Sequence, residues 1–223
     1  MPSPTGEILI MSTSMSLKSS VGSVLVSVIT RQTIDGPVVR WLLDCGRPVD
    51  IVCGHHSVIR NRIVQVERFI KSAHDWLFVL DCDTVPVSGT IEALVAASGP
   101  NEIHIAPSWM FFTNPTDVLP MAVRRNANGT YSPFAAGTTG IHEVDGAGMS
   151  GALFSRDVFQ KVGTTFSEGP DGRGGWTTED FPFWERCQAA GWRIMAHFDL
   201  IADHIKTVPL GLLVRNEDVT EAR

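Results

Sequence analysis

The chain of 223 residues lacks the features that mark several large classes of protein. No apolar run approaches the ~18 residues of a membrane span, and the first 20 residues lack the basic start and long apolar stretch of a signal peptide. Lys and Arg number 18 against 24 Asp and Glu, which argues against duplex nucleic acid as the main partner, because phosphate contacts need clustered positive charge. The four cysteines never occur in Cys-x-x-Cys spacing, so neither a zinc knuckle nor a disulfide framework is indicated. We expect reduced thiols in a cytoplasmic protein.

What the chain does contain is the composition of an ordinary folded domain, 43% hydrophobic and 19% charged. Its first half alternates between β-branched apolar runs and helical patterns, which favours a parallel sheet with crossover helices. The helix capped by Ser57 carries an apolar stripe that is expected to face the core: Ile59, Ile63, Val66 and Ile70. In chain order we predict a strand at 21–30, a helix at 37–45, a strand at 49–53, the helix after Ser57, a strand at 76–83, a helix at 90–97 and a strand at 103–109.

The second half departs from this alternation. Asn128-Gly129 is a turn signal between two extended runs, so residues 110–143 are predicted to form an antiparallel flap. Residues 167–176 are rich in glycine, and we expect a mobile loop whose Trp176 either packs in the core or closes over a bound sugar. The remaining elements are a helix at 156–162, a helix capped by Thr178 that runs to 190, and a strand at 192–198.

Two carboxylates stand at the end of the most apolar strand. Residues 76–80 are all apolar, and Asp81 and Asp83 follow them at i and i+2 spacing. In a strand these side chains project to the same side, where they repel each other unless a cation or a shared proton lies between them. The carboxyl end of a buried strand is where ligands bind in open α/β sheets, and oxygen ligands favour Mn²⁺ or Mg²⁺. The alternative is a surface turn, since Pro86 and Gly89 follow closely.

Three more motifs accompany Leu80-Asp81-Cys82-Asp83 along the chain. They are Ile59-Arg60-Asn61-Arg62, the glycine-rich residues 144–156, and Thr178-Glu179-Asp180-Phe181 followed by Gly191-Trp192 and His204. The four motifs span residues 58–205, about two thirds of the chain. In this order they resemble the nucleotide-sugar glycosyltransferases of the GT-A fold, in particular those of family 2.

The resemblance implies an α/β fold of the GT-A type, a Rossmann-like and mostly parallel sheet flanked by helices, with a small antiparallel flap. It implies one glycosyltransferase domain over residues 1–223. Within it we expect a loose lead-in at 1–20, a nucleotide-binding half at 21–109, an acceptor-side half at 110–205 and a tail at 206–223.

The resemblance also implies roles for individual residues. Asp83, Asp81 and His204 are expected to hold Mn²⁺ or Mg²⁺ against the diphosphate of the donor, whose leaving group develops negative charge. Asp180 matches the base that takes the proton of the acceptor hydroxyl, and Glu179 is expected to orient it or to contact the acceptor. The competing interpretation is that these two acids only favour a helix dipole. Contacts to the nucleotide are expected from Thr30, Arg31, Arg60 and Asn61.

The chain departs from the family pattern at the nucleotide base. The family usually has an Asp after the second strand, but residues 52–56 contain none, so UDP-linked and GDP-linked donors both stay open. The acceptor hydroxyl, on a glycan, a protein or a small molecule, is open too. Small stand-alone transferases of this kind resemble those carried by bacteria and their phages, which implies the cytoplasm, or the host cytoplasm for a phage protein.

Three other functions compete with this interpretation. A haloacid-dehalogenase-like phosphatase also places Asp-x-Asp after an apolar strand, although there the motif lies near the start of the chain. A nucleotidyltransferase is close in fold and would release pyrophosphate. A non-catalytic module that binds a sugar nucleotide is the third. We expect an inverting sugar transfer, since a single base on the acceptor side favours direct displacement.

Overall fold

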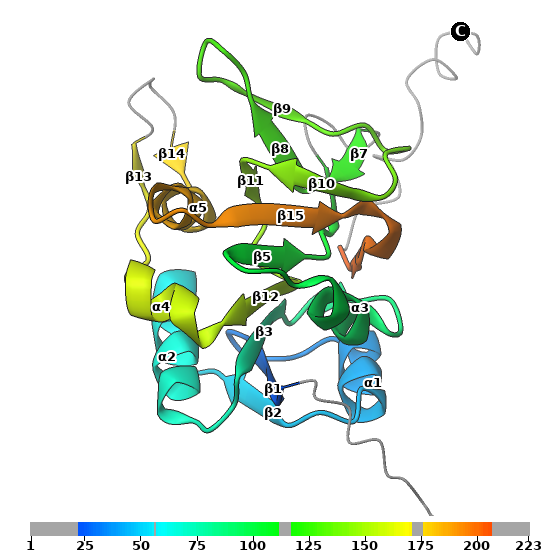
Figure 1. Cartoon of the computed structure of the whole chain (residues 1–223). Helices are drawn as coiled ribbons and strands as arrows, with labels where there is room; N and C mark the ends of the chain where they lie inside the picture. The colour runs from blue at the N-terminus through cyan, green and yellow to red at the C-terminus, as the bar shows by residue number, and fades with distance from the viewer. Residues whose placement is uncertain (1–21, 56, 112–116, 171–175, 207–223) are drawn as a thin grey trace, which may run out of the picture.

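The fold is built around a seven-stranded sheet that reaches across the molecule (Figure 1). The computed structural model describes residues 22–55, 57–111, 117–170 and 176–206. The strands of the sheet, in spatial order, are β10 (Ile141–Val144), β15 (Arg193–His197), β5 (Glu102–Ile105), β12 (Ala152–Ser155), β3 (Trp76–Asp81), β1 (Val24–Ile29) and β2 (Val49–Val52). Five of them run parallel, while β12 and β10 run antiparallel to their neighbours. The predicted mixed, mostly parallel GT-A-type sheet is therefore confirmed.

Helices cover both faces of this sheet because its central strands are apolar on both sides. In β3, Leu77 and Val79 point into one core together with α2 (Val58–Lys71), α4 (Arg156–Val162) and α5 (Asp180–Ala189). Phe78 and Leu80 point into the other core together with α1 (Gly36–Asp44) and α3 (Thr90–Ala97). Figure 1 shows the two groups of helices on opposite sides of the sheet.

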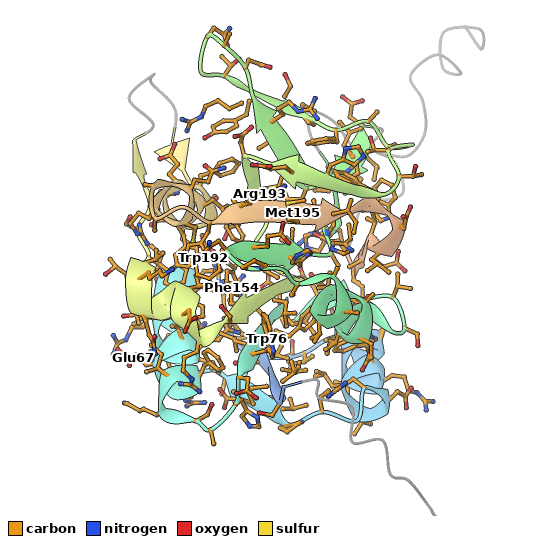
Figure 2. All side chains as sticks on the ribbon, viewed as in Figure 1. Glu67, Trp76, Phe154, Trp192, Arg193 and Met195 are labelled. Carbon is orange, nitrogen blue, oxygen red and sulfur yellow. The ribbon has the colours of Figure 1, made fainter. Side chains whose placement is uncertain are left out.

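The core under α4 and α5 is aromatic. Phe154 of β12, labelled in Figure 2, lies against Phe159 of α4 and stacks on Trp184 of α5 with the ring planes 17° apart. The Trp184 indole donates a 2.6 Å hydrogen bond to the carbonyl of Ala147. Aromatic pairs add to the free energy that area burial supplies, so this cluster holds the start of α5 firmly against the sheet.

Smaller antiparallel sheets lie beyond the large one. They pair β6 (Trp109–Phe111) with β7 (Val118–Pro120), β8 (Ala122–Arg125) with β9 (Tyr131–Pro133) and β11 (Gly146–Ala147), β13 (Gly169–Pro170) with β14 (Trp176–Thr177), and β4 (Thr84–Val85) with β16 (Asp203–His204). The turn between β8 and β9 contains Asn128-Gly129 as predicted, and Gly129 has a φ of 77°, which favours glycine. No helix in the described ranges combines the length and apolarity needed to cross a membrane.

Three boundaries differ from the predictions. The expected strand at 103–109 divides into β5 and β6, with Pro107, which has no N–H to donate, between them. β10 lies at the edge of the large sheet and not in the flap. α5 begins at Asp180 with Glu179 as its N-cap residue, so Thr178 does not cap it.

The buried face of α2 also differs from the predicted stripe. Val66 is buried and Ile59 and Ile63 are partly buried, but Ile70 is 38% exposed. Polar side chains share the buried face instead: Asn61, Arg62 and Gln65. The helix is turned so that these three point toward the carboxyl ends of β1 and β3, and this rotation decides the composition of the site.

Candidate active site

A cavity of about 800 Å³ opens at the carboxyl ends of β1 and β3. Its size is that of a small-molecule site, and its position is the usual one for ligands in open α/β sheets. Four segments far apart in the chain line it: residues 29–33 after β1, Val58 and Asn61 in the first turn of α2, residues 81–83 after β3, and His204 with Lys206 near the end of the described chain.

Strand pairing brings His204 to the carboxylates. The short strand β4 follows Asp83, and it pairs with β16 so that Thr84 lies opposite His204. The backbone N–H of Ile205 donates to the carbonyl of Asp83 at 2.8 Å. As a result the imidazole Nε2 of His204 lies 3.2 Å from Asp83 Oδ2, although 121 residues separate the two in the chain.

A hydrogen bond on the side of the ring away from Asp83 orients His204. Its Nδ1 lies 3.0 Å from the backbone carbonyl of Trp109, and because a carbonyl can only accept, Nδ1 carries the hydrogen. In a neutral imidazole Nε2 then presents a lone pair toward the Asp83 carboxylate. Two such electron-rich atoms lie close together only with a positive charge between them or on the ring. A carbonyl behind a histidine is also the usual arrangement that orients a metal ligand.

Asp83 is held as an anion. Burial by itself would raise the pKa of its carboxyl, but hydrogen bonds from His204 and Lys206, together with their positive charges, lower the pKa to about 2. The Lys206 ammonium lies 2.7 Å from the same Oδ2 atom. Asp83 is therefore ionised throughout the neutral pH range.

Asp81 has a different partner. Its Oδ1 lies 2.6 Å from a guanidinium nitrogen of Arg62, and its backbone N–H donates to the Ser150 hydroxyl at 2.9 Å. β3 ends at Asp81, so the alternation of side chains that predicted two parallel carboxylates does not continue to Asp83. Both residues line the cavity, yet one is bound to an arginine and the other to a histidine and a lysine.

The donor set of Asp83 and His204 fits a divalent cation that takes its other ligands from a substrate. In the described part of the chain, no group of three or more His, Cys, Asp or Glu side chains is arranged to hold a metal by itself. Cations that act on phosphates are commonly held by one or two protein side chains, while phosphate oxygens and water complete the coordination. The oriented imidazole and the ionised carboxylate meet this requirement, and Lys206 would have to leave Asp83 for the cation to bind.

The predicted base lies at the first residue of α5. Asp180 Oδ1 is buried and has no hydrogen-bond partner. Burial raises the pKa of Asp180 well above its usual range, and the negative charges of Glu179 and Asp81 raise it further, while Arg62 opposes them. Glu179 makes no side-chain capping hydrogen bond. Asp180 does lie in the first turn, where the helix dipole favours an acid, but the dipole alone does not explain why one of its oxygens is buried without a hydrogen-bond partner.

Three of the predicted nucleotide contacts line the cavity, and the fourth does not. Thr30 is buried and its hydroxyl accepts from the backbone N–H of Gln32, which shapes the loop after β1. Arg31 is exposed at the cavity edge. Asn61 is 1% exposed, and its amide donates to the carbonyls of Thr30 and His55, which leaves Oδ1 without a partner. Arg60 is exposed and does not line the cavity.

Two charged residues of the site were missed by the sequence analysis. Arg62 is 2% exposed and pairs with Asp81, whereas the sequence analysis chose its exposed neighbour Arg60. The only sequence signal was the run of polar residues at 61, 62 and 65, which one helical face carries. Lys206 carried no signal, since it follows the last recognisable motif and reaches the site only through the pairing of β16 with β4.

His197 and Trp109 do not line this cavity. His197 is buried in β15, where its Nε2 lies 2.8 Å from His104 Nδ1, and burial lowers its pKa to about 4. Trp109 is half-buried and contributes the carbonyl that orients His204. His56 and the side chain of Trp176, the proposed lid, lie outside the described residues.

Comparison with known proteins gives a family and two similar folds. A sequence model of the family described as "Glycosyltransferase like family 2" matches residues 16–218. The solved structure of A197 from STIV superposes with a TM-score of 0.61 and 17% identity, over 83% of this chain and 86% of that one. GalNAc-T7, solved with UDP, GalNAc and Mn²⁺, gives a TM-score of 0.58 and 10% identity, over 85% of this chain but only 45% of the other. No curated protein matches by sequence.

Proposed function

The chain belongs to glycosyltransferase-like family 2, and from this premise we propose that it moves a sugar from a nucleoside-diphosphate donor to an acceptor hydroxyl with the help of a divalent cation. Glycosyltransferase activity is what membership of the family supports. The observation that carries the finer proposal is the contact of Asp83 with His204 inside a cavity of substrate size. It assembles an anion and an oriented imidazole where a diphosphate would lie.

Different residues of the cavity would bind different parts of the donor. Asp83 and His204 would hold the cation, which when bound supplies positive charge to the departing diphosphate. Lys206, released from Asp83, carries a second positive charge for the same phosphates. At the other end of the cavity, the unpaired Oδ1 of Asn61 offers a hydrogen-bond acceptor to an N–H or O–H group of the nucleoside.

Asp180 takes the proton of the acceptor hydroxyl in this proposal. A carboxyl whose pKa is raised is a stronger base than an ordinary aspartate, and its buried, unpaired oxygen is free to accept a proton. Glu179 lies next to it and keeps that pKa high. A single Asp base on the acceptor side favours a direct displacement, so the transfer is proposed to invert the anomeric configuration.

The choice of donor and metal follows from the ligand set and the similar folds. An imidazole ligand suits Mn²⁺ better than Mg²⁺, which prefers oxygen in all positions. Because GalNAc-T7 was solved with UDP and Mn²⁺, UDP-linked sugars with Mn²⁺ are the first combination to test, and GDP-linked sugars the second. The acceptor stays a hydroxyl of unspecified class, and the cytoplasmic location expected from the free thiols stays part of the proposal.

A thermal-shift panel of nucleoside diphosphates and their sugars, with and without Mn²⁺, tests the donor site. A ligand at 100 times its Kd stabilises the folded protein by about 2.7 kcal/mol. For a chain of this size that raises Tm by roughly 5 to 10 °C. We expect the shift only when nucleotide and Mn²⁺ are both present, and we expect Asp83→Asn to remove it.

The products then identify the reaction. Sugar transfer releases a nucleoside diphosphate, a nucleotidyltransferase would release pyrophosphate, and a phosphatase would release inorganic phosphate. Asp50→Asn is the control variant, since Asp50 lies within β2, does not line the cavity and pairs with Arg68 of α2. The assignment of the site would be refuted if Asp83→Asn kept the full thermal shift and only Asp50→Asn lost it.

A further inference from the structure

Among the described residues, Arg62 is the most deeply buried charged side chain that contacts the candidate site. It is 2% exposed, and one of its terminal nitrogens lies 2.6 Å from Asp81 Oδ1. Its Nε lies 4.0 Å from Glu179 Oε1, and its charge acts on Asp180. A guanidinium is removed from water at a large cost in free energy, so a buried one is kept only where anions surround it. The anions around Arg62 are the carboxylates of Asp81, Glu179 and Asp180.

The guanidinium is held in place from the helix side. Its other terminal nitrogen lies 3.4 Å from Gln65 Oε1, one turn further along α2. The Gln65 amide in turn donates a 2.6 Å hydrogen bond to the carbonyl of Ser27 in β1. Both Gln65 and Ser27 are fully buried. Arg62 is therefore anchored to the central sheet, and its planar fork cannot turn away from the carboxylates without breaking this chain of contacts.

Two polar atoms of the cluster remain unpaired. Arg62 Nε is a buried donor without a partner, and Asp180 Oδ1 is a buried acceptor without a partner. Buried polar atoms are nearly always hydrogen-bonded, and exceptions gather where a ligand or a reaction completes the set. An unsatisfied donor and an unsatisfied acceptor around the same carboxylate cluster indicate that the cluster is not arranged for stability alone.

We propose that Arg62 is a positioning residue that joins the donor side of the site to its acceptor side, holding Asp81 with one edge of its guanidinium and facing Glu179 and Asp180 with another. This proposal rests on the sugar transfer proposed above. Its physical content is that one positive charge partly offsets the mutual repulsion of three carboxylates. Without Arg62, Asp81 loses its partner and turns freely into the cavity, while Glu179 and Asp180 repel each other and Asp81 without compensation.

The neighbouring Arg60 shows why this role falls to Arg62. The two residues lie about 200° apart around an α-helix, so they point to opposite sides. Arg60 is exposed and does not line the cavity, whereas Arg62 points to the end of β3 and the start of α5. The positioning residue thus lies in the motif that the sequence analysis selected, two positions beyond the arginine that it chose.

The test compares Arg62→Met, which removes the charge, with Arg62→Lys, which keeps it but cannot contact both sides at once. The first measurement needs no activity: a ¹³C NMR titration of the Asp180 carboxyl in the free protein. Since Arg62 lowers the pKa of Asp180, the Met variant should titrate at higher pH than the wild type and the Lys variant close to it. Unchanged titration in Arg62→Met would overturn the proposal even if no donor is ever found.

The second measurement is turnover against pH. We expect Arg62→Met to lose about 10- to 100-fold in kcat at neutral pH, with its activity profile shifted toward alkaline pH. Arg62→Lys should keep the wild-type profile at an intermediate rate. Arg68→Met is the matched control, because Arg68 lies on the same helix but pairs with Asp50 at the surface. It should change neither rate nor profile.

The outcomes separate the two proposals. A wild type that transfers no sugar while the Asp180 titration moves as expected refutes the proposed function and leaves the contact role of Arg62 supported. An active wild type with an equally active Arg62→Met variant refutes the positioning role alone. If Arg62→Met does not fold, Arg62→Lys decides: wild-type turnover in that variant overturns the proposal, and a fall of about 10-fold with an unshifted profile supports it.

Discussion

Asp83 lines the cavity and Asp180 lies outside its lining, and the environments of these two aspartates shift their pKa values in opposite directions. Asp83 stands after a strand, its side chain is 26% exposed, and a histidine and a lysine lower its pKa to about 2. Asp180 opens a helix, its Oδ1 is buried without a partner, and burial with two neighbouring acids raises its pKa. The first environment maintains a permanent anion that can bind a cation, and the second maintains a carboxyl that can exchange a proton.

The comparison explains why neither residue could take the other's part. A base with a pKa near 2 would hold a transferred proton too weakly, and a carboxyl that stays protonated would be a poor ligand for a cation. Arg62 lies between the two environments and contacts the third acid, Asp81. Each of the following changes breaks or sharpens the contrast.

Asp180→Asn should have the largest effect. It removes the proton acceptor, so turnover is expected to fall by about 10²- to 10⁴-fold while binding of the donor with Mn²⁺ is unchanged. Turnover of the wild type should rise with pH through the neutral range, because the base must first ionise and its pKa is raised. Initial rates with a radiolabelled donor, from pH 5 to 9, measure both.

The control for this change is Asp157→Asn. Asp157 also lies in the first turn of a helix, α4, but it is exposed. The substitution should leave turnover as it is. Turnover of Asp180→Asn within a few-fold of the wild type would show that another group takes the proton.

The substitutions Asp180→Asn and Asp83→Asn should change the free energy of unfolding in opposite directions. A raised pKa means that ionising Asp180 destabilises the fold, so this penalty is absent near pH 4 and grows as pH rises through the raised value. Asp180→Asn should therefore gain stability relative to the wild type as pH rises, with a larger gain at pH 8 than at pH 5, because an amide pays no ionisation penalty.

Asp83→Asn should do the reverse. A lowered pKa contributes stability above the ordinary pKa of aspartate, and this contribution disappears as pH falls from about 4 toward 2. The variant is then less stable than the wild type at neutral pH. Urea unfolding at pH 5 and pH 8 measures both variants, and equal shifts of the same sign would remove the proposed difference between the two environments.

The smallest effect is expected from Lys206→Met. The Lys206 ammonium occupies the carboxylate oxygen that a cation would need, so its removal should strengthen Mn²⁺ binding to the nucleotide-free protein by about two- to fivefold, the range of a half-exposed ion pair. Isothermal titration with Mn²⁺ measures the change. Arg47→Met, which breaks an ion pair with Glu92 elsewhere, is the control. Weaker Mn²⁺ binding in Lys206→Met would mean that the lysine supports the cation site.

Prediction from the sequence was most successful where a pattern repeats along the chain. Apolar runs located the central strands, and the order of four motifs identified the family and the GT-A-type fold that the comparisons show. It was least successful where the rotation of a helix about its own axis decides which of two nearby residues is buried. The stripe that selected Ile70 is a quarter of a turn away from the observed buried face, which Arg62 and Gln65 share. In the sequence, polar residues on a buried helix face cannot be distinguished from polar residues on a face exposed to solvent.

The order of residues along the chain supplies the reactive groups: two acids after a buried strand, two more at the start of a late helix, and a histidine near the end of the last motif. Their different environments arise only in the folded protein. A pairing of two residues in each of β4 and β16 places His204 and Lys206 on Asp83, and the packing around α5 buries one carboxylate oxygen of Asp180. The reason is physical: a pKa depends on distance and on water, and both are properties of the folded chain.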